Sequence, residues 1–311
     1  MSASHKPRLA LTAISLTVIA VIASALTVSA LIVARPALSA ARPAALTAYT
    51  EPAAPPGLAV LTPDHKLANG KKGVGVWPFR GSRSALAKSG VSWYYTWAVG
   101  HPGITTARGV SFVPMIWGPR NVTARQLRLA KRQGHTLLTF NEPDLPAQSN
   151  MTVAEALRLW PKLMATKMRL ASPAVAGGGA TPGGWLDQFM SGAAQRHYRV
   201  NFITLHWYGA DFSTSAAVSQ LESYIQAVWN RYHKPIWLTE FALWKFGPSV
   251  FPSPSGQAAF VRAATAMLQK LPYVWRYAWF ALPADGADGT AGLFRPGAVP
   301  TAAGRAFEKV P

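Results

Sequence analysis

Two glutamates stand out because each ends a short apolar stretch in a chain with few acids. Glu142 ends the stretch HTLLTFNE at residues 135–142, and Glu240 ends the stretch PIWLTE at residues 235–240. The chain of 311 residues contains only 12 Asp and Glu residues. Two carboxyl groups held together can act on a glycosidic bond, one as the acid and the other as the base or nucleophile. The pair therefore suggests cleavage of a glycosidic bond.

The elements that would hold these glutamates are eight apolar, aromatic or β-branched stretches, with helical patterns or loops between them. Most are continuous apolar runs, which is typical of parallel strands buried on both faces. Eight such strands with mostly helical crossovers predict an α/β fold, a single (β/α)8 TIM barrel. A doubly wound open sheet is the alternative, although no Gly-x-Gly-x-x-Gly motif follows an early strand. We expect the strands at 73–79, 91–97, 111–117, 136–141, 174–177, 202–208, 236–241 and 276–281.

Several of the segments between the strands carry helix signals. Thr123 and Thr152 each begin a capping-box pattern, with Gln or Glu three residues later, and Gly134 is placed to end the first of these helices. The segment at 100–109 is too short for a long helix. We therefore expect an irregular crossover between the second and third strands.

A barrel would give the two glutamates a shared location. Catalytic groups of barrel enzymes lie at the carboxyl ends of the strands, where Glu142 follows the fourth predicted strand and Glu240 ends the seventh. His206 and Tyr208 end the sixth strand and could donate hydrogen bonds to a nucleophile, which must be ionised. The structural alternatives are a loop residue or helix cap for Glu142 and a buried ion pair for Glu240. For His206 the alternative is a structural histidine with satisfied hydrogen bonds, and for Tyr208 it is packing in the barrel wall.

Six tryptophans fall at or near the ends of the predicted strands. The C–H faces of pyranose rings stack on indole rings, so a saccharide cleft would use such residues. Trp207 and Trp244 adjoin the motifs described above and are the first candidates to contact sugar, followed by Trp77 and Trp279. Packing at the barrel rim is the alternative for each. The six are Trp77, Trp97, Trp117, Trp207, Trp244 and Trp279.

Three motifs in this order resemble the clan A glycoside hydrolases. They are FNEPD at 140–144, LHWY at 205–208 and LTEFA at 238–242. The closer resemblance is to glycoside hydrolase family 128, and it extends over roughly residues 72–307.

This resemblance implies a retaining, endo-acting β-1,3-glucanase that works through a glycosyl-enzyme intermediate. It implies that Glu142 is the general acid/base and that Glu240 is the nucleophile. It also implies that Asn141 holds the sugar 2-hydroxyl next to the reacting carbon. The residues expected to bind substrate are Asn141, His206, Trp207, Tyr208, Trp244, Trp279 and Trp77.

Residues 1–33 look like a targeting segment. Lys6 and Arg8 precede 25 uncharged residues, Leu9–Val33. As a helix these would span about 37 Å, which is enough to cross a bilayer core of about 30 Å. We therefore expect an exported protein, with the segment either cleaved as a signal peptide or retained as a membrane anchor. The expected location is extracellular, in the cell envelope or periplasmic.

The rest of the chain divides into a linker and one domain. Residues 34–71 are rich in Pro and Ala, which predicts a semi-extended spacer. Residues 72–311 then form the predicted catalytic domain.

The composition excludes cysteine chemistry and shows a strongly basic chain. There is no cysteine, so a disulfide framework and a thiolate nucleophile are excluded. The net charge of +19 would attract anionic surfaces, but no run or spacing typical of nucleic-acid binding is present. Asp285 and Asp288 lack the oxygen-rich spacing of a metal site. We expect a monomer that binds a polysaccharide or oligosaccharide, with no cofactor, no metal and no nucleic acid.

Two other functions fit the same scaffold. A non-catalytic envelope protein that binds glycan would need the tryptophans but not the carboxyl pair, so the presence of both glutamates disfavours it. A transglycosylase of cell-envelope polysaccharide metabolism would use the same covalent intermediate with a sugar as acceptor. Nothing in the sequence separates this last reaction from hydrolysis.

Overall fold

The computed structural model describes residues 70–284 and 290–311. The predicted targeting segment at 1–33 and almost all of the predicted linker at 34–71 lie outside these residues, as do Asp285 and Asp288. Within the described ranges, no helix combines the length and the apolar character needed to cross a membrane.

The strands form a ring in which neighbouring strands are parallel. One set pairs in the order β3-β2-β1-β9-β8-β7 and a second in the order β4-β5-β6. Parallel bridges from Ala171 to Phe202 and from Val175 to Leu205 join the two sets on one side. The strands are β1 (Lys72–Gly75), β2 (Trp93–Tyr95), β3 (Ser111–Phe112), β4 (Met115–Ile116), β5 (Thr136–Asn141), β6 (Arg169–Ala174), β7 (Ile203–Gly209), β8 (Ile236–Leu243) and β9 (Val274–Trp279).

On the other side, β3 and β4 are two parts of one barrel strand. β3 pairs with β2, whereas β4, which begins three residues after β3 ends, pairs with β5. Pro114 lies in this break and has no N–H to donate to a neighbouring strand. Counting β3 and β4 together gives eight strand positions around a closed barrel. The (β/α)8 fold predicted from the sequence is confirmed.

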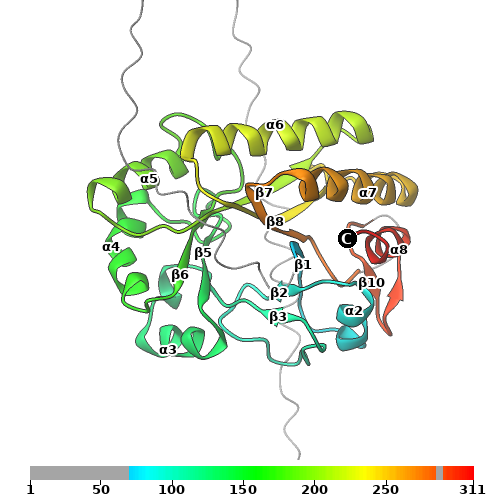
Figure 1. Ribbon diagram of the computed structural model, residues 1–311, viewed down its shortest axis with the longest axis horizontal. Helices are drawn as coiled ribbons and strands as arrows, with labels where there is room; N and C mark the ends of the chain where they lie inside the picture. The colour runs from blue at the N-terminus through cyan, green and yellow to red at the C-terminus, as the bar shows by residue number, and fades with distance from the viewer. Residues whose placement is uncertain (1–69, 285–289) are drawn as a thin grey trace, which may run out of the picture. The chain divides into compact units, whose positions relative to one another are not determined.

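Helices surround the strands, as Figure 1 shows. They begin where the sequence signals indicated: Thr123 and Thr152 accept hydrogen bonds from backbone N–H groups three residues later. No helix lies between β2 and β3, so the irregular crossover is also confirmed. The helices are α2 (Ser82–Lys88), η1 (Pro119–Asn121), α3 (Ala124–Gln133), α4 (Val153–Met164), α5 (Trp185–Gln195), α6 (Thr214–Tyr232), α7 (Pro254–Lys270) and α8 (Ala302–Glu308), with a hairpin of β10 (Phe294–Arg295) and β11 (Val299–Pro300) before α8.

The fifth barrel strand lies earlier in the chain than the sequence predicted. We expected residues 174–177, but β6 covers Arg169–Ala174 and includes Ser172 and Pro173. These residue types normally mark a strand's end. Here the Ser172 hydroxyl accepts a hydrogen bond from the Thr204 N–H at 3.0 Å, so a side chain provides one of the links between β6 and β7.

The barrel interior is a packed core rather than a pore. Its side chains come from strands all around the ring, which is the normal filling of such barrels. The catalytic glutamates predicted from the sequence lie above this filling, at the carboxyl ends of β5 and β8. The buried interior residues are Trp93, Tyr95, Val113, Met115, Leu138, Ala171, Phe202, Trp237 and Ala278.

Candidate active site

Glu142 and Glu240 come together at the carboxyl ends of their strands. Glu142 directly follows β5, and its N–H donates to the Ala174 carbonyl at 2.7 Å. Its φ of 40° lies in the left-handed region, which is uncommon for a residue other than glycine. Glu240 lies within β8. The two residues are only 8% and 4% exposed, so both carboxyl groups are largely removed from water.

His206 lies between the two carboxyl groups. Its Nδ1 is 2.9 Å from Glu142 Oε1, and its Nε2 is 3.5 Å from Glu240 Oε1. One oxygen of each glutamate and one nitrogen of the imidazole all lie within 4.8 Å of one another. A proton on Nδ1 would be donated to Glu142, while Nε2 is buried and has no hydrogen-bond partner among the described residues. The imidazole therefore couples the charges of the two acids.

The carboxylate of Glu240 accepts hydrogen bonds at both oxygens. Trp97 Nε1 donates to Oε1 at 2.7 Å. The single proton of the Tyr95 hydroxyl is shared between the Thr239 carbonyl at 2.9 Å and the same Oε1 at 3.2 Å. The Tyr208 hydroxyl donates to Oε2 at 2.6 Å. Burial, together with the charge of Glu240, holds the pKa of Tyr95 and of Tyr208 well above the usual value of 10. Both tyrosines therefore remain protonated and can only donate to the ionised acid.

The pKa values of Glu240 and His206 result from opposing effects. Burial raises the pKa of Glu240, the charge of His206 lowers it, and the charge of Glu142 raises it. Hydrogen bonds from Tyr208 and Trp97 lower it, and the net direction is upward. Burial lowers the pKa of His206, but the charges of Glu240 and Glu142 outweigh burial and raise it above 6.5. The positive charge of a protonated His206 therefore favours the anionic form of Glu240.

Asn141 ends β5 immediately before Glu142. Its Nδ2 donates to Gln148 Oε1 at 3.1 Å, whereas its Oδ1 is buried and has no partner among the described residues. Two residues after Glu142, the Asp144 carboxylate accepts the Ala176 N–H at 3.0 Å. That bond links the loop after β5 to the loop after β6. The amide oxygen of Asn141 is thus free to accept a hydrogen bond from a substrate hydroxyl.

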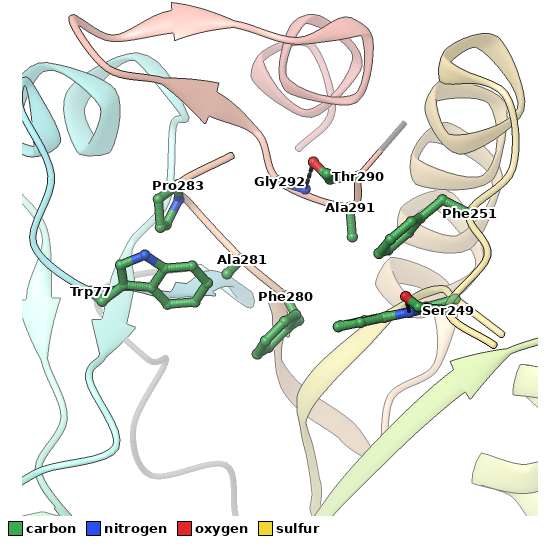
Figure 2. A pocket seen from close by; sticks show the side chains of 10 residues that line it. Trp77, Ser249, Phe251, Phe280, Ala281, Pro283, Thr290, Ala291 and Gly292 are labelled. Carbon is green, nitrogen blue, oxygen red and sulfur yellow. Dashed lines mark hydrogen bonds between the residues drawn. The ribbon is translucent and has the colours of Figure 1, made fainter. Parts of the chain in front are cut away.

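An aromatic pocket adjoins these groups. The ring centroid of Phe280 lies 5.7 Å from that of Trp97 and 5.7 Å from that of Tyr208, the two strongest donors to Glu240. Trp77 and Trp244 lie on either side, each with its centroid 6.0 Å from Phe280. Figure 2 shows this pocket, about 180 Å³ in volume. Its lining comprises Trp77, Trp244, Ser249, Phe251, Phe280, Ala281, Pro283, Thr290, Ala291 and Gly292.

Two of the predicted sugar-binding tryptophans lie elsewhere, and this corrects the sequence interpretation. Side chains alternate along a strand, so Trp207 points away from the face that carries His206 and stacks on Phe260 of α7, with centroids 5.7 Å apart. Trp279 is fully buried, and its Nε1 donates to the Ala291 carbonyl at 2.7 Å. In this structure neither indole belongs to the catalytic group or to the aromatic pocket.

The sequence reasoning missed three members of the site. Tyr95 and Phe280 were not among the predicted residues, and Trp97 was predicted only as a residue that stacks on sugar. Phe280 packs on Trp97 and also lines the aromatic pocket. A signal for the first two exists: Trp93, Tyr95 and Trp97 occur at every second position, which places them on one face of β2 and its extension. Because Trp93 fills the barrel interior, Tyr95 and Trp97 follow it toward the mouth.

The three coupled groups also have the spacing of a metal site. Glu142, His206 and Glu240 could each provide one ligand atom. The hydrogen-bond donors around Glu240 are better suited to stabilising a free carboxylate, because both of its oxygens already accept N–H or O–H groups. The expectation of a metal-free site remains a prediction.

A TIM barrel with two buried carboxyl groups close together at the carboxyl ends of its strands is typical of glycoside hydrolases. Comparisons with known proteins agree. Residues 76–307 match the family model described as "Glycosyl hydrolase catalytic core". A subgroup I endo-β-1,3-glucanase of glycoside hydrolase family 128 from Amycolatopsis mediterranei, solved with laminarihexaose, is 55% identical; the match covers 78% of this chain and 99% of that one, with a TM-score of 0.75. The chain belongs to glycoside hydrolase family 128, as its three motifs predicted.

Two more distant relatives are also similar to this chain. A subgroup II endo-β-1,3-glucanase from Sorangium cellulosum is 30% identical over 78% of this chain and 98% of its own, with a TM-score of 0.65. Alkali-sensitive linkage protein 1 of Schizosaccharomyces pombe is 32% identical over 225 residues, which are 68% of this chain. The match spans only 39% of that protein's length.

Proposed function

We propose that this protein is an endo-acting β-1,3-glucanase that retains the anomeric configuration. The single observation that carries the mechanism is the approach of one oxygen of Glu142 to one oxygen of Glu240 within 4.8 Å. Retaining enzymes hold their carboxyl groups about 5–5.5 Å apart, whereas inverting enzymes need about 6.5–9.5 Å to admit a water molecule. Relatives solved with laminarihexaose and laminaritriose support a β-1,3-linked glucan as the substrate.

The hydrogen bonds assign the two roles. Glu240 accepts hydrogen bonds from Trp97 and Tyr208, with the Tyr95 hydroxyl also within reach, and is suited to the anionic nucleophile. Among the described residues, the carboxyl group of Glu142 forms its hydrogen bond with the imidazole and is suited to carrying the proton. In the first step Glu240 attacks the anomeric carbon, and the glycosidic bond breaks as Glu142 protonates the leaving oxygen. In the second, Glu142 takes a proton from water, the water oxygen attacks the same carbon, and Glu240 leaves as a carboxylate.

The neighbouring side chains would position the sugar. The free Oδ1 of Asn141 can accept the hydrogen bond of the 2-hydroxyl next to the reacting carbon. Trp77 and Trp244 each keep part of their indole exposed and border the aromatic pocket, where pyranose rings can stack. Trp207 and Trp279 are not part of this proposal.

Export to the cell envelope or beyond is the proposed location. Its support is the sequence of residues 1–33, which has the charge and length of a signal peptide or membrane anchor. The basic surface is compatible with an anionic envelope: α3 contains three arginines, Arg125, Arg128 and Arg132, and also Lys131, with no acidic residue. Activity as a monomer is part of the same proposal.

The test uses two single substitutions and a matched control. Glu142→Gln and Glu240→Gln are each expected to remove nearly all hydrolysis of laminarin while leaving the melting temperature close to that of the wild type. Glu222→Gln, the same change on the exposed face of α6, is expected to retain full activity. Wild-type turnover by either active-site variant would refute the assignment of the catalytic pair.

Product analysis separates the remaining alternatives. NMR of the first product is expected to show the anomer of the substrate; initial release of the opposite anomer would refute retention. Longer oligosaccharides formed from laminari-oligosaccharide mixtures would indicate a transglycosylase instead of a hydrolase. Binding of laminarin without any product after long incubation would indicate the non-catalytic glycan-binding protein.

A further inference from the structure

Two arginines point into the barrel at the end opposite to the catalytic glutamates. Arg169 begins β6, and Arg276 lies near the beginning of β9. Two residues further along each strand, Ala171 and Ala278 belong to the barrel interior. Because side chains alternate along a strand, both arginines share that inward face. The backbone N–H of Arg169 donates to the His135 carbonyl at 2.7 Å, but neither guanidinium group forms an ion pair or a hydrogen bond within the described part of the chain.

Arg276 packs against two adjoining indole rings, whose centroids are 5.2 Å apart. Its guanidinium carbon lies 4.5 Å from the ring centroid of Trp237 and 5.3 Å from that of Trp93. The residue is 8% exposed, and its Nε is buried without an acceptor. The indole Nε1 of Trp237 is likewise buried and has no acceptor among the described residues. Two buried N–H donors from adjoining side chains therefore both lack a partner.

Arg169 adds a second positive charge to this end of the barrel. Its guanidinium carbon lies 5.2 Å over the ring of Trp275, the residue next to Arg276. Burial lowers the pKa of Arg276 to about 10, and the charge of Arg169 acts in the same direction. The fold thus keeps two repelling cations near each other, although most buried charges in proteins are paired. Aromatic faces compensate the charge in part, but they do not satisfy the free N–H groups.

We propose that this end of the barrel is a binding site for a small oxyanion of the phosphate or sulfate type. Such an anion would accept the free N–H groups of Arg276 and Trp237, and it would neutralise the repulsion between Arg276 and Arg169. The planar guanidinium group suits the oxygens of a tetrahedral anion. The site lies at the far end of the strands from Glu142 and Glu240, so it is separate from glucan cleavage.

Thermal unfolding of the full chain tests this proposal. Melting temperatures are measured against increasing sodium phosphate and, separately, sodium sulfate, with chloride added to hold the ionic strength constant. A ligand that binds only the folded state raises the melting temperature, by about 5–10 °C at a hundredfold excess over its dissociation constant. We expect a saturable rise for the wild type. A rise with only one of the two salts identifies the preferred anion.

Three variants make the test specific. Arg276→Met should abolish the anion-dependent rise, and Arg169→Met should weaken anion binding at least tenfold, since each removes one of the two charges. Arg158→Met, on the exposed face of α4, is the matched control and should keep the full rise. If Arg276→Met does not fold, Arg169→Met decides, because its side chain is only half-buried.

Two results would overturn the proposal. One is the absence of any saturable rise in the wild type with either anion, which would mean that water alone satisfies these donors. The other is an equal rise in all three variants, which would place anion binding elsewhere on the basic surface. Hydrolysis of laminarin is expected to be unchanged in Arg169→Met, so failure of the anion site and failure of the proposed glucanase activity are distinguishable.

Discussion

Replacement of Tyr208 by Phe isolates one hydrogen bond of the proposed nucleophile. The Tyr208 hydroxyl donates to Glu240 Oε2 at 2.6 Å, and this donor lowers the pKa of a carboxyl group whose pKa burial raises. Phenylalanine keeps the ring that packs on Phe280 and removes only the hydroxyl. A hydrogen bond to a charged group contributes about 1.5–3 kcal/mol. Its loss should therefore reduce kcat/KM about 10- to 150-fold.

The pH dependence gives a second, independent measure of the same bond. Without the hydroxyl, the pKa of Glu240 rises further, because this donor stabilises the anion more than it stabilises the protonated acid. Activity requires the anion, so the acidic limb of the kcat/KM profile on laminarin should move to higher pH. Trp97 and Tyr95 still donate to the other oxygen, so activity is reduced rather than abolished.

Tyr273→Phe provides the matched control for Tyr208→Phe. Its hydroxyl donates to Gln226 Oε1 at 2.5 Å, beside α6 and away from the glutamates. This variant should keep the wild-type rate and pH profile. The reasoning would be refuted if Tyr208→Phe, with an unchanged melting temperature, kept the wild-type kcat/KM, or if its acidic limb moved to lower pH.

Three further predictions concern single residues. Trp244→Ala should raise KM for laminarin severalfold with little change in melting temperature. Trp279→Ala should instead lower the free energy of unfolding by about 3–5 kcal/mol, as expected for a buried aromatic residue. The opposite pattern in kinetics and denaturant unfolding would contradict the assignment of these two tryptophans. Protonated His206 stabilises the folded state because its pKa is raised there, so this contribution is complete below about pH 6.5 and is lost as the pH rises through the folded-state value. The stability difference between wild type and His206→Gln should therefore shrink at alkaline pH in urea unfolding, and a difference independent of pH would exclude this coupling. Thr152→Ala should cost about 1 kcal/mol, since the side chain caps α4; unchanged urea unfolding would show that this cap contributes nothing.

The barrel was predictable because its strands are buried on both faces. Seven of the eight expected strands lie largely on the observed ones, and the fifth shares only Ala174 with β6, since continuous apolar runs leave few other arrangements. The fifth strand was predicted too late in the chain because Ser172 and Pro173 are residue types that usually mark the end of a strand. Their accommodation depends on Thr204, a partner more than thirty residues away in the chain. Local propensity contains no information about such a partner.

The sequence by itself determined the barrel and the family, because continuous apolar strands indicate the fold and the three motifs are specific; it also predicted the pair of glutamates that the structure brings together. Only the tertiary structure decided which side chains surround Glu240. Strand alternation directs Tyr208 toward it and Trp207 away from it, and burial removes Trp279 from the cleft. The Tyr95 hydroxyl reaches Glu240 from another part of the barrel. Closure of the ring brings the end of β2, which carries Tyr95, close to Glu240 on β8. Such proximity is set by the packing of the whole ring, which no local stretch of residues encodes.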